Sequence, residues 1–146
     1  MRATMQYLAH FERDDDGWLV TFPSLPEAIT GGPDLAVART NAIDALDVVL
    51  LTSAKDGREI PPGDKPQKSK EHELVSPSAS VVAKLGFVDA FRKSGLTRVE
   101  LARRLGKAEG EIRRMLDPYH ATKLPALEEA MKALGKRYIL LVEEVA

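Results

Sequence analysis

Residues 96–116, LTRVELARRLGKAEGEIRRML, have the spacing of a helix-turn-helix unit. The small residue Ala102 stands where two helices would cross, and Gly106 follows four residues later, where the chain must turn. Ile112 comes six residues after Gly106, on the inner side of the second helix. Such a unit needs a small residue at the crossing, a turn residue that adopts a positive φ, and apolar anchors. The segment therefore predicts a DNA-binding pair of helices; the alternative is a plain helical hairpin with a solvated basic face.

Charge is divided unevenly along the chain. The formal net charge of the whole chain is −1, yet residues 1–80 hold 8 basic and 13 acidic residues, a net of −5. Residues 81–146 hold 13 basic and 9 acidic residues, a net of +4. A basic module joined to an acidic one predicts a polyanion as partner of the second and a more basic surface as partner of the first.

Composition limits the class of protein. The 146 residues are 44% hydrophobic and 29% charged, as expected of a globular chain, and the absence of cysteine excludes a disulfide framework. No apolar run approaches the roughly 20 residues that span a bilayer, and the N-terminus turns acidic too early for a signal peptide. We therefore expect a cytoplasmic protein without membrane contact, with a domain boundary near residues 80–83.

The first part of the chain predicts a small sheet covered by one helix. Residues 5–11 and 18–22 are rich in β-formers and flank a turn, which is typical of an antiparallel hairpin. Residues 35–54 repeat apolar side chains at helical spacing, with Asp34 as the expected N-cap. Residues 31–33 are expected to form a loop, and Pro77 favours an edge strand over residues 73–82.

The second part predicts helices only, apart from its tail. Thr97 and Glu100 have the spacing of a capping box, and Gly135 would close the last helix. The expected helices cover residues 82–94, 97–105, 108–116 and 125–134. The tail 137–145, RYILLVEEV, is predicted as a strand, with a helix as the alternative.

The second helix of the helix-turn-helix unit would present its N-terminal half and outward face to DNA. Neighbouring residues on a helix lie about 100° apart, so one of Arg113 and Arg114 is expected to read a base while the other holds phosphate. Thr97, at a helix N-terminus, is a phosphate candidate. The predicted DNA contacts are Thr97, Lys107, Ala108, Glu109, Gly110, Arg113 and Arg114.

A single unit of this kind reads only half of an operator. We therefore expect a homodimer, or a higher even oligomer, on pseudo-palindromic double-stranded operator DNA. An apolar strand at a chain end invites pairing, so the tail is the expected interface, with packing on its own domain as the alternative. The predicted dimerisation residues are Tyr138, Ile139, Leu140, Leu141 and Val142.

Catalytic and metal-binding chemistry finds little support in the sequence. The histidines His10, His72 and His120 are scattered without ligand spacing. The acidic run 14–16 is dense, but consecutive residues at a hairpin turn do not converge on one cation, and the calcium-loop pattern is absent. No nucleophile elbow and no phosphate-binding loop occur. We expect no catalytic residue, no metal site and no cofactor.

Two segments resemble the N-terminal domain of HicB-type antitoxins, the antitoxins of the HicAB toxin–antitoxin class. They are GWLVTFPSLPEAITGG at residues 17–32 and DLAVARTNAIDAL at residues 34–46. The pattern is a strand that ends in proline, an x-Leu-Pro turn, a Thr-Gly loop and an Ala-rich helix; Glu27 departs from it where the family usually has glycine. The matching residues are Phe22, Pro23, Leu25, Pro26, Thr30, Gly31 and Ala42. One branch of this family also carries a C-terminal helix-turn-helix.

The resemblance implies an α+β fold: a partial ribonuclease-H-like sheet plus helix without its catalytic carboxylates, followed by an all-helical helix-turn-helix domain. It implies that residues 1–80 neutralise a cognate HicA-type toxin, a small basic ribonuclease that cleaves mRNA. Residues 81–146 would bind operator DNA, dimerise and repress the chain's own operon. The candidate charged contacts with the toxin are Asp14, Asp15, Asp16, Asp44 and Asp47.

Two other functions remain open at this point. The first is a transcriptional regulator whose N-terminal domain senses a small molecule, and the second is a degraded nuclease-like enzyme. Ligand-dependent DNA affinity would favour the regulator, and metal-dependent cleavage would favour the enzyme. A neighbouring reading frame for a short basic protein would favour the antitoxin.

Overall fold

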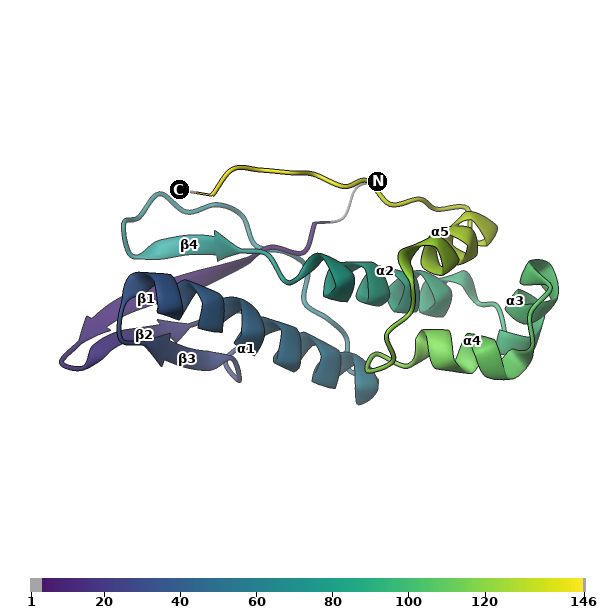
Figure 1. Cartoon of the computed structure of the whole chain (residues 1–146), viewed down its shortest axis with the longest axis horizontal. Helices are drawn as coiled ribbons and strands as arrows, with labels where there is room; N and C mark the ends of the chain where they lie inside the picture. Colours follow the sequence, from purple (N-terminus) through teal and green to yellow (C-terminus); the bar gives the residue numbers. More distant parts are fainter. Residues whose placement is uncertain (1–3, 146) are drawn as a thin grey trace. The chain divides into compact units, whose positions relative to one another are not determined.

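Four antiparallel strands form the sheet of the first unit, in the order β3-β2-β1-β4 (Figure 1). The computed structural model describes residues 4–145. The chain folds into two compact units, residues 1–82 and 83–146. The expected hairpin is confirmed as β1 (Tyr7–Asp14) and β2 (Gly17–Thr21). Both edges of the sheet are short strands, β3 (Ile29–Gly32) beside β2 and β4 (His72–Val75) beside β1.

The glycines of β3 were expected in a loop, and this prediction is wrong. Gly31 pairs with Leu19 in the sheet, and a Cβ atom on Gly31 would overlap the backbone carbonyl oxygen of Trp18. A Cβ atom on Gly32 would come within 2.7 Å of the backbone nitrogen of Ala38. The two glycines therefore permit close packing of backbone segments, which is a common reason for glycine within a strand.

Helix α1 (Leu35–Lys55) covers one face of this sheet (Figure 1). The Asp34 side chain accepts a hydrogen bond from the Val37 N–H at 2.9 Å, so the predicted N-cap is confirmed. The predicted apolar stripe is buried at Ala38, Ala42, Leu46 and Leu50. It packs against the sheet face from which Tyr7, Ala9 and Phe11 project, since alternate residues of β1 are buried.

The Pro-rich connector between α1 and β4 is tied to the sheet by Asp64. Its carboxylate accepts hydrogen bonds from the Leu8 N–H at 2.8 Å and the Ser24 hydroxyl at 2.7 Å. The Tyr7 hydroxyl donates to the Pro61 carbonyl at 2.6 Å. Burial, with the Asp64 charge as a smaller cause, raises the pKa of Tyr7 to about 12. β4 follows as the predicted edge strand, but it ends at Val75, and residues 79–82 are helical instead.

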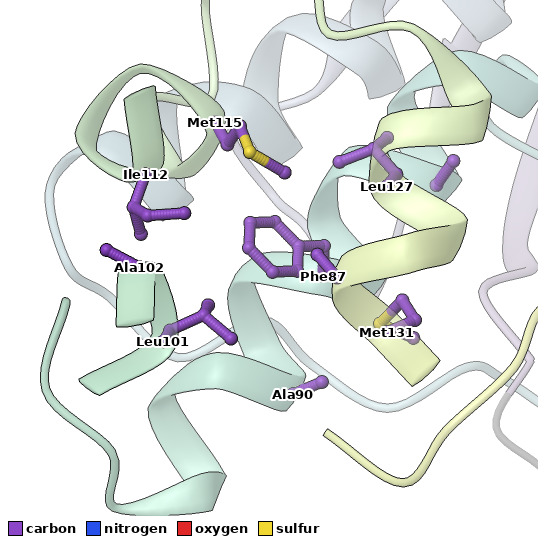
Figure 2. Close-up of a cluster of buried hydrophobic side chains, with 10 residues drawn as sticks. Phe87, Ala90, Leu101, Ala102, Ile112, Met115, Leu127 and Met131 are labelled. Atoms are coloured by element: carbon purple, nitrogen blue, oxygen red, sulfur yellow. The ribbon is translucent and has the colours of Figure 1, made fainter. Parts of the chain in front are cut away.

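Among the described residues of the second unit there are four helices: α2 (Ala79–Ser94), which begins in the first unit, α3 (Arg98–Leu105), α4 (Glu109–Leu116) and α5 (Leu124–Ala133). Phe87 of α2 is fully buried at the centre of their shared core, with side chains of α3, α4 and α5 around it (Figure 2). The buried cluster comprises Ala83, Phe87, Ala90, Leu101, Ala102, Ile112, Met115, Leu127, Ala130 and Met131.

The tail after α5 was expected to form a strand, and in the single chain this prediction is wrong. Residues 136–145 have no regular secondary structure. The Tyr138 hydroxyl donates to the Ala83 carbonyl at 2.6 Å, but Ile139 is 65% exposed and Val142 84%. A strand needs a neighbour to satisfy its backbone groups, and within residues 83–145 the second unit contains no strand.

Phe87→Ala is expected to destabilise the second unit selectively. Removal of a buried phenylalanine side chain costs about 3–5 kcal/mol because it leaves a cavity. The chain's single tryptophan, Trp18, lies in the first unit, so its fluorescence reports unfolding there, whereas far-ultraviolet circular dichroism is dominated by helices. We expect part of the dichroism transition to move to lower denaturant concentration while the fluorescence midpoint stays. Equal shifts of both signals would contradict independent stability of the two units.

Candidate functional site

A sharp turn joins α3 to α4. The local sequence determines both where α3 begins and where the turn follows it. The Thr97 hydroxyl accepts a hydrogen bond from the Glu100 N–H at 3.1 Å, and the Glu100 carboxylate accepts from the Thr97 N–H at 3.4 Å. This confirms the predicted capping box at the start of α3. Gly106 ends α3 with a φ of 64°, and the Lys107 N–H donates to the Ala102 carbonyl at 2.9 Å. A positive φ favours glycine, so the predicted turn residue is also confirmed.

The inner face of α4 is anchored in the core. Ile112 is fully buried and Met115 nearly so, and both belong to the cluster that contains Leu101 and Ala102 of α3 (Figure 2). Ala102 is 5% exposed, so a larger side chain there would push the two helices apart. The anchoring fixes which residues of α4 face outward.

Two arginines on the outer face of α4 differ in their ion pairs. The Glu109 carboxylate pairs with Arg113 at 2.5 Å and with Arg98 at 3.2 Å. Arg114 is exposed and forms no ion pair with any residue in the range 4–145. Arg114 is therefore free to approach a ligand without breaking a contact, whereas Arg113 must leave Glu109.

The other predicted DNA contacts lie around the start of α4. Ala108 is its N-cap and makes no side-chain capping bond, so no capping side chain occupies the first backbone N–H groups of the helix. Lys107 pairs with Glu111 at 3.8 Å, and Gly110 is half-buried beside the guanidinium of Arg114. Thr97 is exposed at the start of α3 rather than α4.

Lys84 is a buried cation that the sequence analysis missed. Its side chain lies in α2, is 4% exposed, and donates hydrogen bonds to the Met115 carbonyl at 2.6 Å and the Thr122 hydroxyl at 2.7 Å. Burial lowers the pKa of Lys84 to about 8, and the charge of Asp117 opposes part of that shift. Lys84 therefore fastens the C-terminal end of α4 to α2. Its position between the apolar residues Val81 and Val88 was the available signal.

The acidic residues predicted to contact a partner lie on different elements of the first unit and differ in exposure. The run 14–16 is exposed at the β1–β2 turn, where the Asp14 carboxylate accepts from the Asp16 N–H at 3.0 Å. Asp44 is exposed on α1. Asp47 is half-buried and accepts hydrogen bonds from the backbone N–H of Ser78 at 2.9 Å and from its hydroxyl. Asp47 therefore has a role within the first unit.

Histidines that looked scattered in the sequence are partly brought together. His10 of β1 lies opposite His72 of β4, with ring centroids 4.7 Å apart, and His10 contacts Glu71 at 3.4 Å. Among the residues that the structure describes, no group of three or more His, Asp or Glu side chains is placed to hold a metal ion. In the same part of the chain, no helix is long and apolar enough to cross a membrane.

Comparison with known proteins finds relatives along nearly the whole chain. Antitoxin HicB 2 of Photorhabdus laumondii is 36% identical over 141 residues, which cover 97% of this chain and 99% of the relative. Antitoxin HicB of Escherichia coli K12 is 39% identical over 128 residues, 88% of this chain and 91% of the relative. Antitoxin HicB of Pseudomonas fluorescens is 36% identical over 126 residues, 86% of this chain and 85% of the relative.

The chain belongs to the HicB antitoxin family. The match spans both units, because a HicB antitoxin aligned over 97% of this chain cannot omit either. No family model matches the chain. The resemblance inferred from residues 17–46 is therefore confirmed by relatives of comparable length, and this HicB-family chain has the expected α+β fold with a C-terminal helical region.

Lys84→Met is expected to change how the stability of this HicB-family chain depends on pH. The pKa of Lys84 lies near 8 in the folded chain and at 10.5 as its ordinary value, so above pH 8 the unfolded state binds more protons. Stability of the parent should therefore rise relative to Lys84→Met between pH 7 and 9.5, by at most about 1.4 kcal/mol per pH unit. Denaturant unfolding of both proteins measures this difference. The other titrating groups are common to both proteins, so their contributions largely cancel. A constant or falling difference would contradict the burial of the Lys84 charge.

Proposed function

We propose that the chain is the antitoxin of a HicAB-type pair, which binds and masks a small mRNA-cleaving HicA-type toxin and represses its own operon as a DNA-bound dimer. The likeness to curated HicB antitoxins across both units carries this proposal. In it residues 1–80 neutralise the toxin, and residues 81–146 bind the operator and dimerise. The chain acts in the cytoplasm and by binding, without a catalytic residue of its own.

The outward face of α4 supports operator binding. A recognition helix must be held rigidly while its polar face stays open, and α4 combines buried Ile112 with exposed Arg113 and Arg114. We assign base reading to Arg114, because it has no ion pair to break, and phosphate contact to Arg113, which Glu109 holds. Thr97, Lys107, Ala108 and Gly110 complete the proposed DNA surface.

Charge supports the division of labour between the two parts. Residues 1–80 have a net charge of −5 and residues 81–146 a net of +4. An acidic surface attracts a basic toxin and repels DNA, whereas the basic part does the reverse, so each partner is steered to its own half of the chain. Asp14, Asp15, Asp16 and Asp44 remain the proposed charged contacts with the toxin; we assign a smaller part to Asp47, which bonds Ser78.

The exposed tail supports dimerisation. Its residues 139–142 are four consecutive apolar side chains that are each at least 65% exposed. An exposed apolar run with unpaired backbone groups gains from pairing with an identical run on a second copy. Tyr138 is anchored on its own unit through Ala83, so we place the interface in residues 139–142 and give Tyr138 the role of the anchor.

The double substitution Arg113→Ala with Arg114→Ala is expected to separate the two activities. Operator affinity should fall strongly, since charge-assisted contacts to DNA are lost, while toxin neutralisation in co-expression should persist. Of the single variants, Arg114→Ala should relax sequence preference, and Arg113→Ala should weaken binding to all sequences alike. Mobility shift on operator and scrambled DNA measures both effects. Unchanged operator affinity of the double variant would overturn the placement of α4 in the groove.

Deletion of residues 139–146 is expected to give a folded monomer with weak operator binding. The deletion keeps Tyr138 and its hydrogen bond to Ala83, so the core of the second unit is left intact. A monomer contacts one half-site, and the avidity of two linked contacts is lost. Light scattering gives the mass, and circular dichroism checks the helices. A shortened protein that remains a dimer would exclude the tail as the interface.

A further inference from the structure

A shallow groove of about 340 Å³ runs between β3 and α1 in the first unit. The edge strand β3 and helix α1 are neighbours in the first unit (Figure 1). Residues at β3 form one wall of the groove and residues of α1 form the other. Two apolar side chains at the groove are widely exposed, Ile29 and Val48, each at 63%. The groove lining includes Glu27, Ile29, Asn41, Asp44, Ala45 and Val48.

The helix wall of this groove has its own periodicity. Asn41, Asp44, Ala45 and Val48 lie at positions i, i+3, i+4 and i+7, which places them on one face of α1. This face differs from the buried stripe of Ala38, Ala42, Leu46 and Leu50 that covers the sheet. Helix α1 therefore has a second partly apolar face, and it borders the sheet edge.

The β3 side of the groove has a hydrogen-bonded end at Gly31 and an exposed end at Ile29. The Asn41 side-chain amide donates to the Gly31 carbonyl at 2.8 Å, which satisfies one backbone group of β3. Ile29 lies two residues away along the same edge strand, beside Thr21 on its inner side. An uncovered edge strand can accept another extended segment, whose alternate side chains enter the adjoining pockets.

The polar residues at the groove indicate the charge of its occupant. Glu27 and Asp44 both line it; Glu27 pairs with Arg58 at 2.9 Å, whereas Asp44 forms no ion pair within residues 4–145. No basic residue lines the groove. A second copy of this chain is disfavoured here, because a two-fold contact brings the same acidic groove against itself.

We propose that this groove is the main docking surface for the toxin, and that it receives an extended toxin segment with an apolar side chain flanked by lysine or arginine. The apolar side chain packs on Val48 and Ile29, and a basic group pairs with Asp44, the groove carboxylate that has no ion pair within residues 4–145. The inference rests on the proposed function and deepens it: it places the main neutralising contact at the β3–α1 edge and leaves the acidic β1–β2 turn as a secondary charged contact.

Val48→Lys in the full-length chain tests the groove, with Thr40→Lys as the matched control. Both residues are exposed on α1 and both variants add one positive charge, but Thr40 does not line the groove. We expect Val48→Lys to weaken binding of a catalytically inactive toxin about 30-fold or more, as at an interface hot spot. Thr40→Lys should change it less than about threefold, because it adds the same charge one helical turn before Asp44 but leaves the apolar lining of the groove unchanged. Calorimetric titration measures the affinities.

Further measurements separate the possible failures. Operator binding and thermal unfolding of Val48→Lys should match those of the parent, which shows that the fold is intact. If the parent binds the toxin and Val48→Lys binds it equally well, the groove is not the docking surface for the toxin, whereas the proposed antitoxin function is unaffected. If the parent does not bind the toxin, the proposed function itself fails. If Val48→Lys changes the mass of the free protein in light scattering, the groove is a contact between copies and the proposal is wrong.

Discussion

Burial of one side of α4 is the interaction on which the proposed DNA surface depends. Eight residues cannot form a stable helix in water on their own, because helix nucleation is unfavourable and few hydrogen bonds follow it. Ile112 and Met115 supply the missing stabilisation by packing around Phe87 with residues of α3 and α5 (Figure 2). Lys84 adds a second attachment at the C-terminal end of the helix. The exposed arginines keep their orientation only because this inner side is fixed.

Sequence patterns predicted the parts of the structure that depend on neighbours along the chain. The Asp34 cap, the Thr97–Glu100 capping box and the turn at Gly106 each involve residues within a few positions, and each is found as expected. The core stripe of α1 is equally local, because a helical period is visible in one segment. These features need no knowledge of the partner element.

Three features that sequence reasoning missed require two distant segments at once. Gly31 looked like a loop residue because its packing against the Trp18 carbonyl is not visible in the local sequence. The role of Lys84 was missed because its acceptors on Met115 and Thr122 come about 30 to 40 residues later in the chain; the flanking Val81 and Val88 indicate burial at most, not the partners. The groove between β3 and α1 needs both the unpredicted strand and the second face of the helix. For the candidate site, the extent of α4 and its outward-facing residues could be predicted from the sequence. The ion pairs that distinguish Arg113 from Arg114 could not.

The Tyr138 anchor has a geometric consequence for any dimer made through the tail. Because its ring rests beside Gly86 and its hydroxyl bonds Ala83, the free part of the tail starts from a fixed point and comprises residues 139–145. Seven extended residues reach about 24 Å. Two such tails paired antiparallel over their full length would hold the two anchors about that far apart, less than one turn of DNA, which is about 34 Å. The length of the tail would thus limit the distance between the two helical units of the dimer. Tail length, as much as apolar character, would then determine which spacing of operator half-sites the dimer can bind.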